Sequence, residues 1–251
     1  MAIVQFPLKL VSRRMLAPTV AHLSFARDDG QPLAFVPGQF LQVHFHYGDG
    51  TATKRSYSLA TRCDQVPDPT LAAEIAVSYV AGGAATALFE GLALGDRVAA
   101  SGPYGRFCLL PTDENQRYLL IATGTGVTPY RAMLPQLATL IAERGTKVVL
   151  LQGARSPEEL LYGDEFRAFA DAHPAHFRFV PCFSRELPGQ PHRDVRHGYV
   201  QQFLAEFAPG PTTDVAYLCG NPNMVDSCFE SLKDAGLDVR QIRREKYVSS
   251  K

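Results

Sequence analysis

The 251-residue sequence has no net charge, because 25 lysines and arginines balance 25 aspartates and glutamates. It therefore lacks the overall field that would attract nucleic acid or an anionic membrane. It also lacks the run of about 20 apolar residues that spanning a bilayer requires. Its first residues, MAIVQFPLKLVSRRM, lack the apolar core and small-residue cleavage site of a signal peptide. We expect a soluble protein that binds neither nucleic acid nor a membrane.

Cysteine is scarce, scattered and odd in number. The five cysteines are Cys63, Cys108, Cys182, Cys219 and Cys228, and no two form a C-x-x-C pair. This spacing argues against a zinc site, an iron-sulfur cluster and the disulfide framework of a secreted protein. We expect no bound metal and a reducing, cytoplasmic location.

The first 110 residues consist of short β-type segments separated by turn residues. The segments are FPLKLVSRRMLA, TVAHLSFAR, QFLQVHFHY, KRSYSLAT, AAEIAVSYV and DRVAASGPYG. One helical piece, ATALFEGL, follows Gly82-Gly83. This half of the chain is typical of an antiparallel barrel or sandwich.

From about residue 117 the pattern alternates between buried strands and helices. The predicted strands are RYLLIATG, KVVLLQGA, FRFVPCFSR and DVAYLCG, and the predicted helices are residues 127–145, 158–173, 199–208 and 223–236. Strands joined by helices favour a parallel sheet with crossover helices. The polar stretch PTDENQR at residues 111–117 is the predicted linker, which gives domains at 1–110 and 111–251.

Three short segments carry residues suited to a nucleotide. Residues 124–129, GTGVTP, and 219–224, CGNPNM, each follow a parallel strand, where glycines and a helix N-terminus favour phosphate binding. Glycines at such turns are equally typical of tight packing, and Cys219 alone is typical of a small buried apolar residue. At residues 54–59, KRSYSL, alternation places Arg55 and Tyr57 on one face, which suits a ligand with a phosphate and a ring. The alternative for this segment is an exposed strand end.

Six motifs in fixed order resemble the ferredoxin-NADP reductase family over nearly the whole chain. They are RSYS at 55–58, GGAAT at 82–86, GPYGRF at 102–107, GTGVTP at 124–129, CGNPNM at 219–224 and EKY at 245–247. The resemblance implies an N-terminal six-stranded antiparallel Greek-key β-barrel that binds FAD. A parallel α/β domain that binds NADP(H) would follow it, with the two reactive rings meeting at the domain interface.

The resemblance also implies roles for single residues. Arg55 would pair with the FAD pyrophosphate, Tyr57 would lie against the isoalloxazine, and Ser58 would hydrogen-bond near flavin N5. Further FAD contacts would come from Ser56, Ala76, Val77, Ser78, Ala84, Ala85, Thr86, Thr125 and Tyr247. NADP contacts would come from Gly124, Gly126, Thr128, Arg155, Ser184, Arg185, Cys219, Gly220 and Asn221. The catalytic set around the rings would be Ser58, Cys219, Glu245 and Tyr247.

The C-terminus departs from the plant-type members, which end at the aromatic residue matching Tyr247. This chain continues through residues 248–251, and the resemblance to bacterial members with a comparable tail implies that these residues reach toward the FAD adenine. Tyr247 then either covers the flavin until nicotinamide displaces it or anchors a frayed terminus.

The resemblance favours NADPH and a protein electron acceptor. Arg155, Ser184 and Arg185 match positions that hold the 2′-phosphate in NADP-using bacterial members, whereas a further arginine of some relatives is Tyr199 here, for which Arg193 or Arg196 could compensate. Because ferredoxins and flavodoxins are acidic, the cations Arg240, Arg243, Arg244 and Lys246 are a candidate docking patch, or else a solvated strand face.

We expect a monomeric FAD-dependent ferredoxin (flavodoxin) NADP(+) reductase. The alternatives are the reductase component of an oxygenase, a free-flavin reductase, or a non-catalytic nucleotide-binding subunit. Oxygenase reductases often carry a fused iron-sulfur domain, and the sequence has no cysteine cluster for one.

Overall fold

The computed structural model describes residues 4–63, 68–70, 72–190 and 193–247. These residues fall into two compact units, one of residues up to 109 together with 128–135, and the other of residues 110–127 together with 136 onward. The predicted domain ranges, 1–110 and 111–251, remain predictions, and the tail at 248–251 lies outside the described residues.

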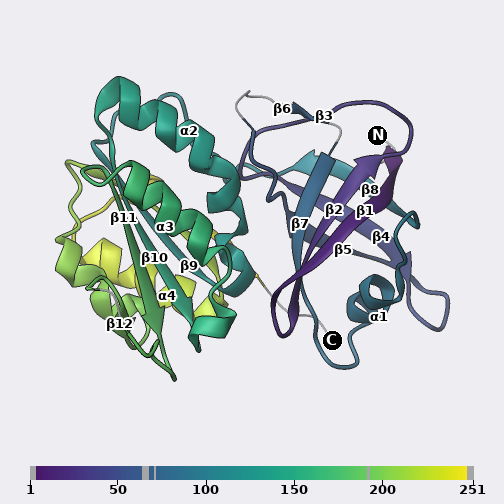
Figure 1. The fold of residues 1–251 in the computed structure, drawn as a ribbon. Coiled ribbons are helices and arrows are strands. Elements are labelled where there is room, and N and C mark those ends of the chain that lie inside the picture. The colour runs from purple at the N-terminus through teal and green to yellow at the C-terminus, as the bar shows by residue number, and fades with distance from the viewer. Residues whose placement is uncertain (1–3, 64–67, 71, 191–192, 248–251) are drawn as a thin grey trace. The chain divides into compact units, whose positions relative to one another are not determined.

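The first unit is a six-stranded antiparallel sheet in the order β5-β4-β8-β1-β2-β7 (Figure 1). The strands are β1 (Gln5–Ala17), β2 (Val20–Arg27), β4 (Phe40–His46), β5 (Ala52–Ser58), β7 (Ala72–Ser78) and β8 (Arg97–Tyr104). A bridge between Leu59 and Ile75 joins the end of β5 to β7, so the two edges of the sheet meet. All six predicted strands and the antiparallel fold are confirmed.

Sequence patterns missed one small sheet in this unit. Strand β3 (Leu33–Phe35) pairs with β6 (Asp68–Thr70) in a separate two-stranded sheet. Each strand has three residues, which is too short for an alternating pattern to be recognised.

Helix α1 (Ala84–Gly91) packs against the core of the first unit. Its predicted range was 85–92, so its existence is confirmed and its start moves by one residue. Phe89 is fully buried in this core, and the Arg13 guanidinium of β1 donates to the carbonyl oxygens of Phe89 and Leu92 at 2.5 and 2.8 Å. Arg13 thereby satisfies carbonyl groups at the end of the helix that have no partner within the helix.

A buried ionic group lies in the same unit. The Arg131 guanidinium lies 2.6 Å from both the Glu74 carboxylate and the Ala60 carbonyl oxygen, and His22 approaches Glu74 at 3.7 Å. Burial alone would raise the pKa of Glu74, but hydrogen bonds from His22 and Arg131 outweigh it and lower the pKa to about 2. Glu74 is therefore ionised throughout the neutral range.

The second unit is a parallel sheet in the order β12-β11-β10-β9-β13-β14 (Figure 1). The strands are β9 (Arg117–Thr123), β10 (Lys147–Ala154), β11 (Phe177–Phe183), β12 (Arg196–His197), β13 (Asp214–Gly220) and β14 (Ile242–Lys246). The longer helices are α2 (Thr128–Arg144), α3 (Gly163–Ala172) and α4 (Pro222–Asp234), and the short 3-10 helices are η1 (Gly124–Val127), η2 (Pro157–Glu159), η3 (Val200–Phe207) and η4 (Val239–Gln241). The predicted parallel α/β fold is confirmed.

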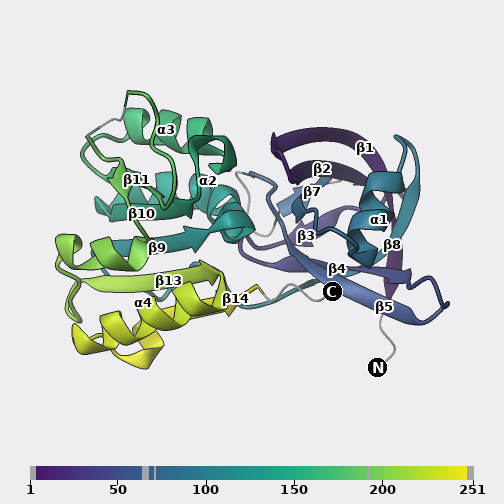
Figure 2. The same ribbon diagram turned by 90° about the horizontal axis from the view of Figure 1, so that it is seen from below.

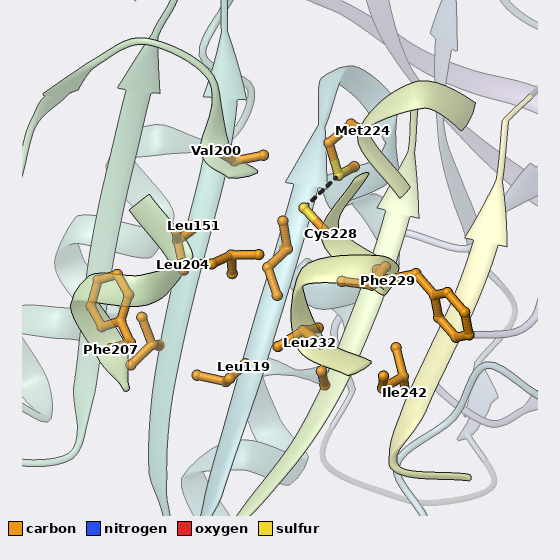
Figure 3. Close-up of a cluster of buried hydrophobic side chains, with 14 of the residues drawn as sticks. Leu119, Leu151, Val200, Leu204, Phe207, Met224, Cys228, Phe229, Leu232 and Ile242 are labelled. Carbon is orange, nitrogen blue, oxygen red and sulfur yellow. Dashed lines mark hydrogen bonds between the residues drawn. The ribbon is translucent and has the colours of Figure 1, made fainter. Parts of the chain in front are cut away.

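Helices cover both faces of this sheet. Figure 2 shows α3 on one face and α4 on the other. On the α4 face, Leu119 and Leu151 of the sheet pack with Leu204 of η3 and Leu232 of α4 in one continuous core (Figure 3). None of the helices in the described residues is long and apolar enough to cross a membrane.

Two helix predictions need correction. The predicted helix at 158–173 is split, because Tyr162 adopts a left-handed conformation with φ of 56°, so η2 ends at Glu159 and α3 begins at Gly163. The predicted helix at 199–208 is the 3-10 helix η3.

The predicted linker residues are tied to the second unit by a charge cluster. Both carboxylate oxygens of Asp113 lie 2.5 Å from the Arg243 guanidinium, and the Tyr118 hydroxyl donates to the same carboxylate at 3.3 Å. The Arg144 guanidinium donates to the Asp113 carbonyl oxygen at 2.8 Å. The Asp113 side chain is buried, so losing its charge would leave Arg243 without its partner.

We predict that Asp113→Asn lowers the free energy of unfolding by roughly 3 kcal/mol, because it removes one partner of a largely buried ion pair. Urea denaturation followed by circular dichroism measures this change. The matched control is Glu230→Gln, whose exposed pair with Lys233 spans 3.9 Å and should change stability by less than about 0.5 kcal/mol. Equal effects of the two substitutions would show that the Asp113 cluster does not stabilise this unit.

Candidate functional site

Strand β5 positions the cation and the ring that the sequence singled out. The Arg55 guanidinium is held by the Tyr47 hydroxyl at 2.8 Å, by the Thr53 hydroxyl at 3.0 Å and by the Lys54 carbonyl oxygen at 2.9 Å. These oxygens fix the guanidinium while leaving it partly exposed to a ligand. Arg55 is therefore a pre-positioned cation and not a solvated strand end.

Tyr57 is oriented by helix α1. Its ring meets the buried Phe89 ring edge-on, with centroids 5.3 Å apart. Burial raises the pKa of the Tyr57 hydroxyl, so the side chain stays neutral. Ser58 at the end of β5 is buried, whereas Ser56 is exposed.

The other predicted FAD residues of the first unit lie on β7 and α1. The bridge between Leu59 and Ile75 brings the end of β5 beside β7, and the contact between Tyr57 and Phe89 brings it beside α1. Ala76 and Val77 are buried, Ser78 is exposed, and Ala84, Ala85 and Thr86 are half-buried. The structure thus brings the predicted FAD segments 55–58, 76–78 and 84–86 together.

The turn before α1 fits a phosphate group. A Cβ atom added to Gly82 would meet no atom within 4 Å, so the backbone there is open to a close ligand. The Thr86 hydroxyl accepts a hydrogen bond from the Val80 amide at 2.8 Å, which fixes this turn. Helix α1 begins at Ala84, and its N-terminal amide groups favour an anion.

In the second unit the glycines of GTGVTP have different roles. Gly124 has φ of 54° and open space where a Cβ would lie, as a phosphate-binding turn requires. At Gly126 a Cβ would lie 2.3 Å from the Cys219 carbonyl oxygen, and at Gly220 it would lie 2.6 Å from the Thr123 carbonyl oxygen. Gly126 and Gly220 therefore let two backbone turns pack together, which was the alternative interpretation.

Polar residues next to these glycines make hydrogen bonds between the two turns and at the start of helix α4. The Thr123 hydroxyl accepts a hydrogen bond from the Asn221 amide at 3.0 Å, and the Asn221 side chain caps α4 by accepting from the Asn223 and Met224 amides. Thr125 is half-buried, and the hydroxyl oxygen of Thr128 is buried with no hydrogen-bond partner in the described structure. The Thr128 hydroxyl is a polar group that a ligand could satisfy.

Cys219 and Glu245 lie side by side because β13 pairs with β14 in that register. Burial, and then the nearby Glu245 carboxylate, raise the pKa of the Cys219 thiol, so the thiol stays protonated. Burial also raises the pKa of Glu245 to about 7. The Glu245 Oε2 atom is buried without a hydrogen-bond partner in the described structure, and the Tyr247 amide donates to the Gly220 carbonyl oxygen at 2.8 Å.

The residues predicted to bind the 2′-phosphate, Arg155, Ser184 and Arg185, lie in two loops that are joined by backbone hydrogen bonds. The Ser184 amide donates to the Ala154 carbonyl oxygen at 3.0 Å, and the Arg185 amide donates to the Arg155 carbonyl oxygen at 3.0 Å. Of the cations considered as substitutes for the arginine missing at Tyr199, Arg196 is engaged with Glu206 at 2.8 Å and Arg193 lies 3.6 Å from Asp194.

The candidate docking patch near the C-terminus is already engaged within the chain. Arg240 pairs with Asp238 and Lys246 with Asp226. Arg243 pairs with Asp113, and Arg244 lies 3.9 Å from the Phe229 ring centroid. These cations therefore do not form a free cationic patch, which favours the alternative interpretation of that segment.

Sequence reasoning missed Tyr47, which holds Arg55. The signal was present, because the hairpin with GDG at 48–50 places Tyr47 near the start of β5. Sequence reasoning also missed the ion pair of Arg155, whose guanidinium lies 2.8 Å from the Glu159 carboxylate. A spacing of four residues carries that signal only if a helical turn is recognised there.

The second unit has a cavity away from the carboxyl edge of its sheet. Its volume is about 860 Å³, and it lies at the amino ends of β9, β10 and β11, lined in part by Arg117, Lys147 and Phe177. It is lined by Arg193, one of the two cations considered as substitutes for the arginine missing at Tyr199, and by none of the other predicted site residues. Within the described residues, no three His, Cys, Asp or Glu side chains are placed to hold a metal ion.

Comparison with known proteins identifies both halves of the chain. Residues 7–108 match the family described as "Oxidoreductase FAD-binding domain", and residues 120–229 match "Oxidoreductase NAD-binding domain". The ferredoxin–NADP reductase B of Sorangium cellulosum is 34% identical over 249 residues, which cover 96% of this chain and 97% of that protein.

Two similar proteins come from Amycolatopsis. The reductase subunit of an aromatic O-demethylase is 37% identical over 223 residues, which cover 87% of this chain and 62% of that subunit. The crystal structure of a cytochrome P450 reductase, GcoB, matches with a TM-score of 0.82 and 32% identity, over 97% of this chain and 70% of that one. The chain thus spans less than two thirds of the demethylase subunit.

The raised pKa of Glu245 predicts a pH-dependent cost in stability. A carboxyl whose pKa rises from 4.5 to about 7 on folding binds more protons in the folded state between those values, so stability falls as pH rises through that window. Glu245→Gln removes the charge, and we expect it to raise the free energy of unfolding at pH 8 by up to roughly 3 kcal/mol, with little change at pH 4.5.

Urea denaturation of both proteins at the two pH values measures this difference. The matched control is Glu230→Gln on the exposed face of α4. It should change the free energy of unfolding by the same small amount at both pH values. The gain in free energy of unfolding of Glu245→Gln over the parent protein should be larger at pH 8 than at pH 4.5. If the gain is the same at both pH values, folding does not raise the pKa of the Glu245 carboxyl.

Proposed function

This chain belongs to the ferredoxin-NADP reductase family of FAD- and NAD-binding oxidoreductases, and we propose that it is an NADPH-dependent reductase that passes electrons to a ferredoxin or flavodoxin. The observation that supports catalysis most directly is the Cys219 and Glu245 pair at the carboxyl edge of the second sheet. A protein that only binds nucleotides has no need for a carboxyl group kept partly protonated at neutral pH by burial.

The first unit supplies groups that fit FAD. Arg55 would bind the pyrophosphate with a guanidinium already fixed by Tyr47. The open backbone at Gly82 and the N-terminus of α1 would receive the same anion. Tyr57 and Ser58 would contact the ring. When bound, FAD supplies the conversion between two-electron hydride transfer and one-electron exchange.

Gly124 of the second unit and Thr128, four residues further along the chain, would face the coenzyme phosphates. Cys219 and Glu245 of the second unit would lie at the nicotinamide. The protonated thiol excludes water without adding charge. Burial raises the pKa of Glu245 to about 7, so its carboxyl group can hold a proton near neutral pH. An ionised Glu245 would favour the cationic oxidised nicotinamide over the neutral reduced form.

The electron acceptor has two candidates. The Sorangium relative, a ferredoxin–NADP reductase that matches over 97% of its length, favours ferredoxin. The engaged cations near the C-terminus and the 37% identity with an O-demethylase reductase subunit favour delivery to an oxygenase. We retain the oxygenase component as the second candidate. Monomeric state and cytoplasmic location stay predictions.

The contacts of Arg55 predict its effect on flavin binding. Arg55→Ala removes a charge-assisted contact worth about 1.5 to 3 kcal/mol, so FAD affinity should fall about ten- to a hundred-fold. Fluorescence titration of the flavin-free protein with FAD measures the change. The control is Lys54→Ala, the exposed neighbour on the same strand, which should bind FAD as the parent protein does. Unchanged FAD affinity in Arg55→Ala would exclude Arg55 from the flavin site.

The proposed reaction is tested on the purified chain. We expect the released flavin to run as FAD in chromatography, and reduction of cytochrome c by NADPH to accelerate at least several-fold when ferredoxin or flavodoxin is added. Acceleration only with an oxygenase component would favour the second candidate. A colourless protein that binds no FAD on titration would contradict the proposed function.

A further inference from the structure

The Arg155 side chain is engaged by a carboxylate of its own chain. Its Nε atom lies 2.8 Å from Oε2 of Glu159, four residues along the chain. The two side chains are 56% and 34% exposed, so solvent weakens this pair and a stronger anion can displace it.

The loop geometry places this pair at the predicted coenzyme edge. The Arg185 and Glu186 amides both donate to the Arg155 carbonyl oxygen, at 3.0 and 3.1 Å. The side chains of Arg155 and Arg185 therefore leave adjacent backbone segments at the carboxyl ends of β10 and β11. In open α/β sheets this edge is where nucleotides bind.

The two arginines differ in what they contact. Arg185 is exposed and has no ion-pair partner among the described residues. Arg155 is the one whose charge is neutralised, and the exposed Glu158 lies next to Glu159 in the same turn. The edge therefore offers one free cation and one neutralised cation to a dianionic 2′-phosphate.

We propose that Glu159 is a specificity-determining residue that lowers the preference for NADPH by occupying Arg155. This inference rests on the proposed function. A 2′-phosphate must displace Glu159 from Arg155 before it can pair with that guanidinium, whereas the 2′-hydroxyl of NADH requires no such exchange. The chain consequently uses both coenzymes, and its preference is set by the competition between carboxylate and phosphate.

The alternative role of this pair is purely structural. An ion pair spaced by four residues stabilises a helical turn by about 0.3 to 0.5 kcal/mol. Loss of such support would disturb the loop for both coenzymes alike, because each carries the same adenosine. Only the competitive role changes the ratio between them.

The test uses the FAD-loaded protein and its Glu159→Gln variant. Calorimetric titration with adenosine 2′,5′-bisphosphate and with 5′-AMP measures the contribution of the 2′-phosphate without catalysis. We expect Glu159→Gln to bind the bisphosphate about three- to ten-fold more tightly, from freed Arg155 and reduced repulsion, and to bind 5′-AMP within about two-fold of the parent protein. The ratio of kcat/KM for NADPH over NADH should rise by the same factor.

Two further variants show whether Glu159 acts through Arg155. Asp164→Asn breaks a similar exposed pair with Arg167 at 2.8 Å and should leave the coenzyme ratio unchanged. Arg155→Gln should weaken bisphosphate binding. In this Arg155→Gln background, Glu159→Gln should increase the bisphosphate affinity by much less than the three- to ten-fold expected in the parent protein.

An unchanged bisphosphate affinity in Glu159→Gln would overturn the proposal. So would equal gains for bisphosphate and 5′-AMP, or the full gain persisting without Arg155. Failure of the proposed function has a separate signature, since neither coenzyme would then reduce the flavin in any variant. The bisphosphate titration would still report on Glu159 in that case.

Discussion

The close approach of two backbone turns at the carboxyl edge of the second sheet is the constraint on which the candidate site depends. A Cβ atom at Gly126 would lie 2.3 Å from the Cys219 carbonyl oxygen, and one at Gly220 would lie 2.6 Å from the Thr123 carbonyl oxygen. Because both glycines lack a side chain, β9 and β13 can end against each other. Pairing of β13 with β14 then places Glu245 opposite Cys219, so the position of the carboxyl group follows from backbone packing.

The position of Glu245 lowers the stability of the folded protein at neutral and higher pH. Burial raises its pKa to about 7, and its Oε2 atom has no hydrogen-bond partner in the described residues. In contrast, Glu74 in the first unit is also half-buried but receives a hydrogen bond from Arg131 and has His22 nearby, and its pKa falls to about 2. The two half-buried carboxyl groups thus differ in whether donors surround them, and the one without donors lies at the candidate site.

Strong periodicity made most of the fold predictable from the sequence. Continuous apolar strands such as KVVLLQGA match β10 residue for residue, and β4 and β5 of the first unit have alternating burial that reports one buried face. The errors have local causes. Tyr162 in the left-handed region breaks a helix that apolar spacing alone would continue, and the three-residue strands β3 and β6 carry no measurable period.

The arginines show why the site was less predictable than the fold. A sequence reports that Arg55, Arg155 and Arg243 are cations, but not which oxygens surround them. Arg243 is committed to Asp113 on both oxygens, so it stabilises the second unit and contributes little field outside it. Arg55 is held by neutral oxygens of Tyr47, Thr53 and Lys54, which orient the guanidinium and leave its charge uncompensated. A guanidinium whose own partners are neutral attracts an external phosphate more strongly than one already paired with a carboxylate. This distinction between neutral and anionic partners depends on three-dimensional contacts that spacing along the chain does not encode.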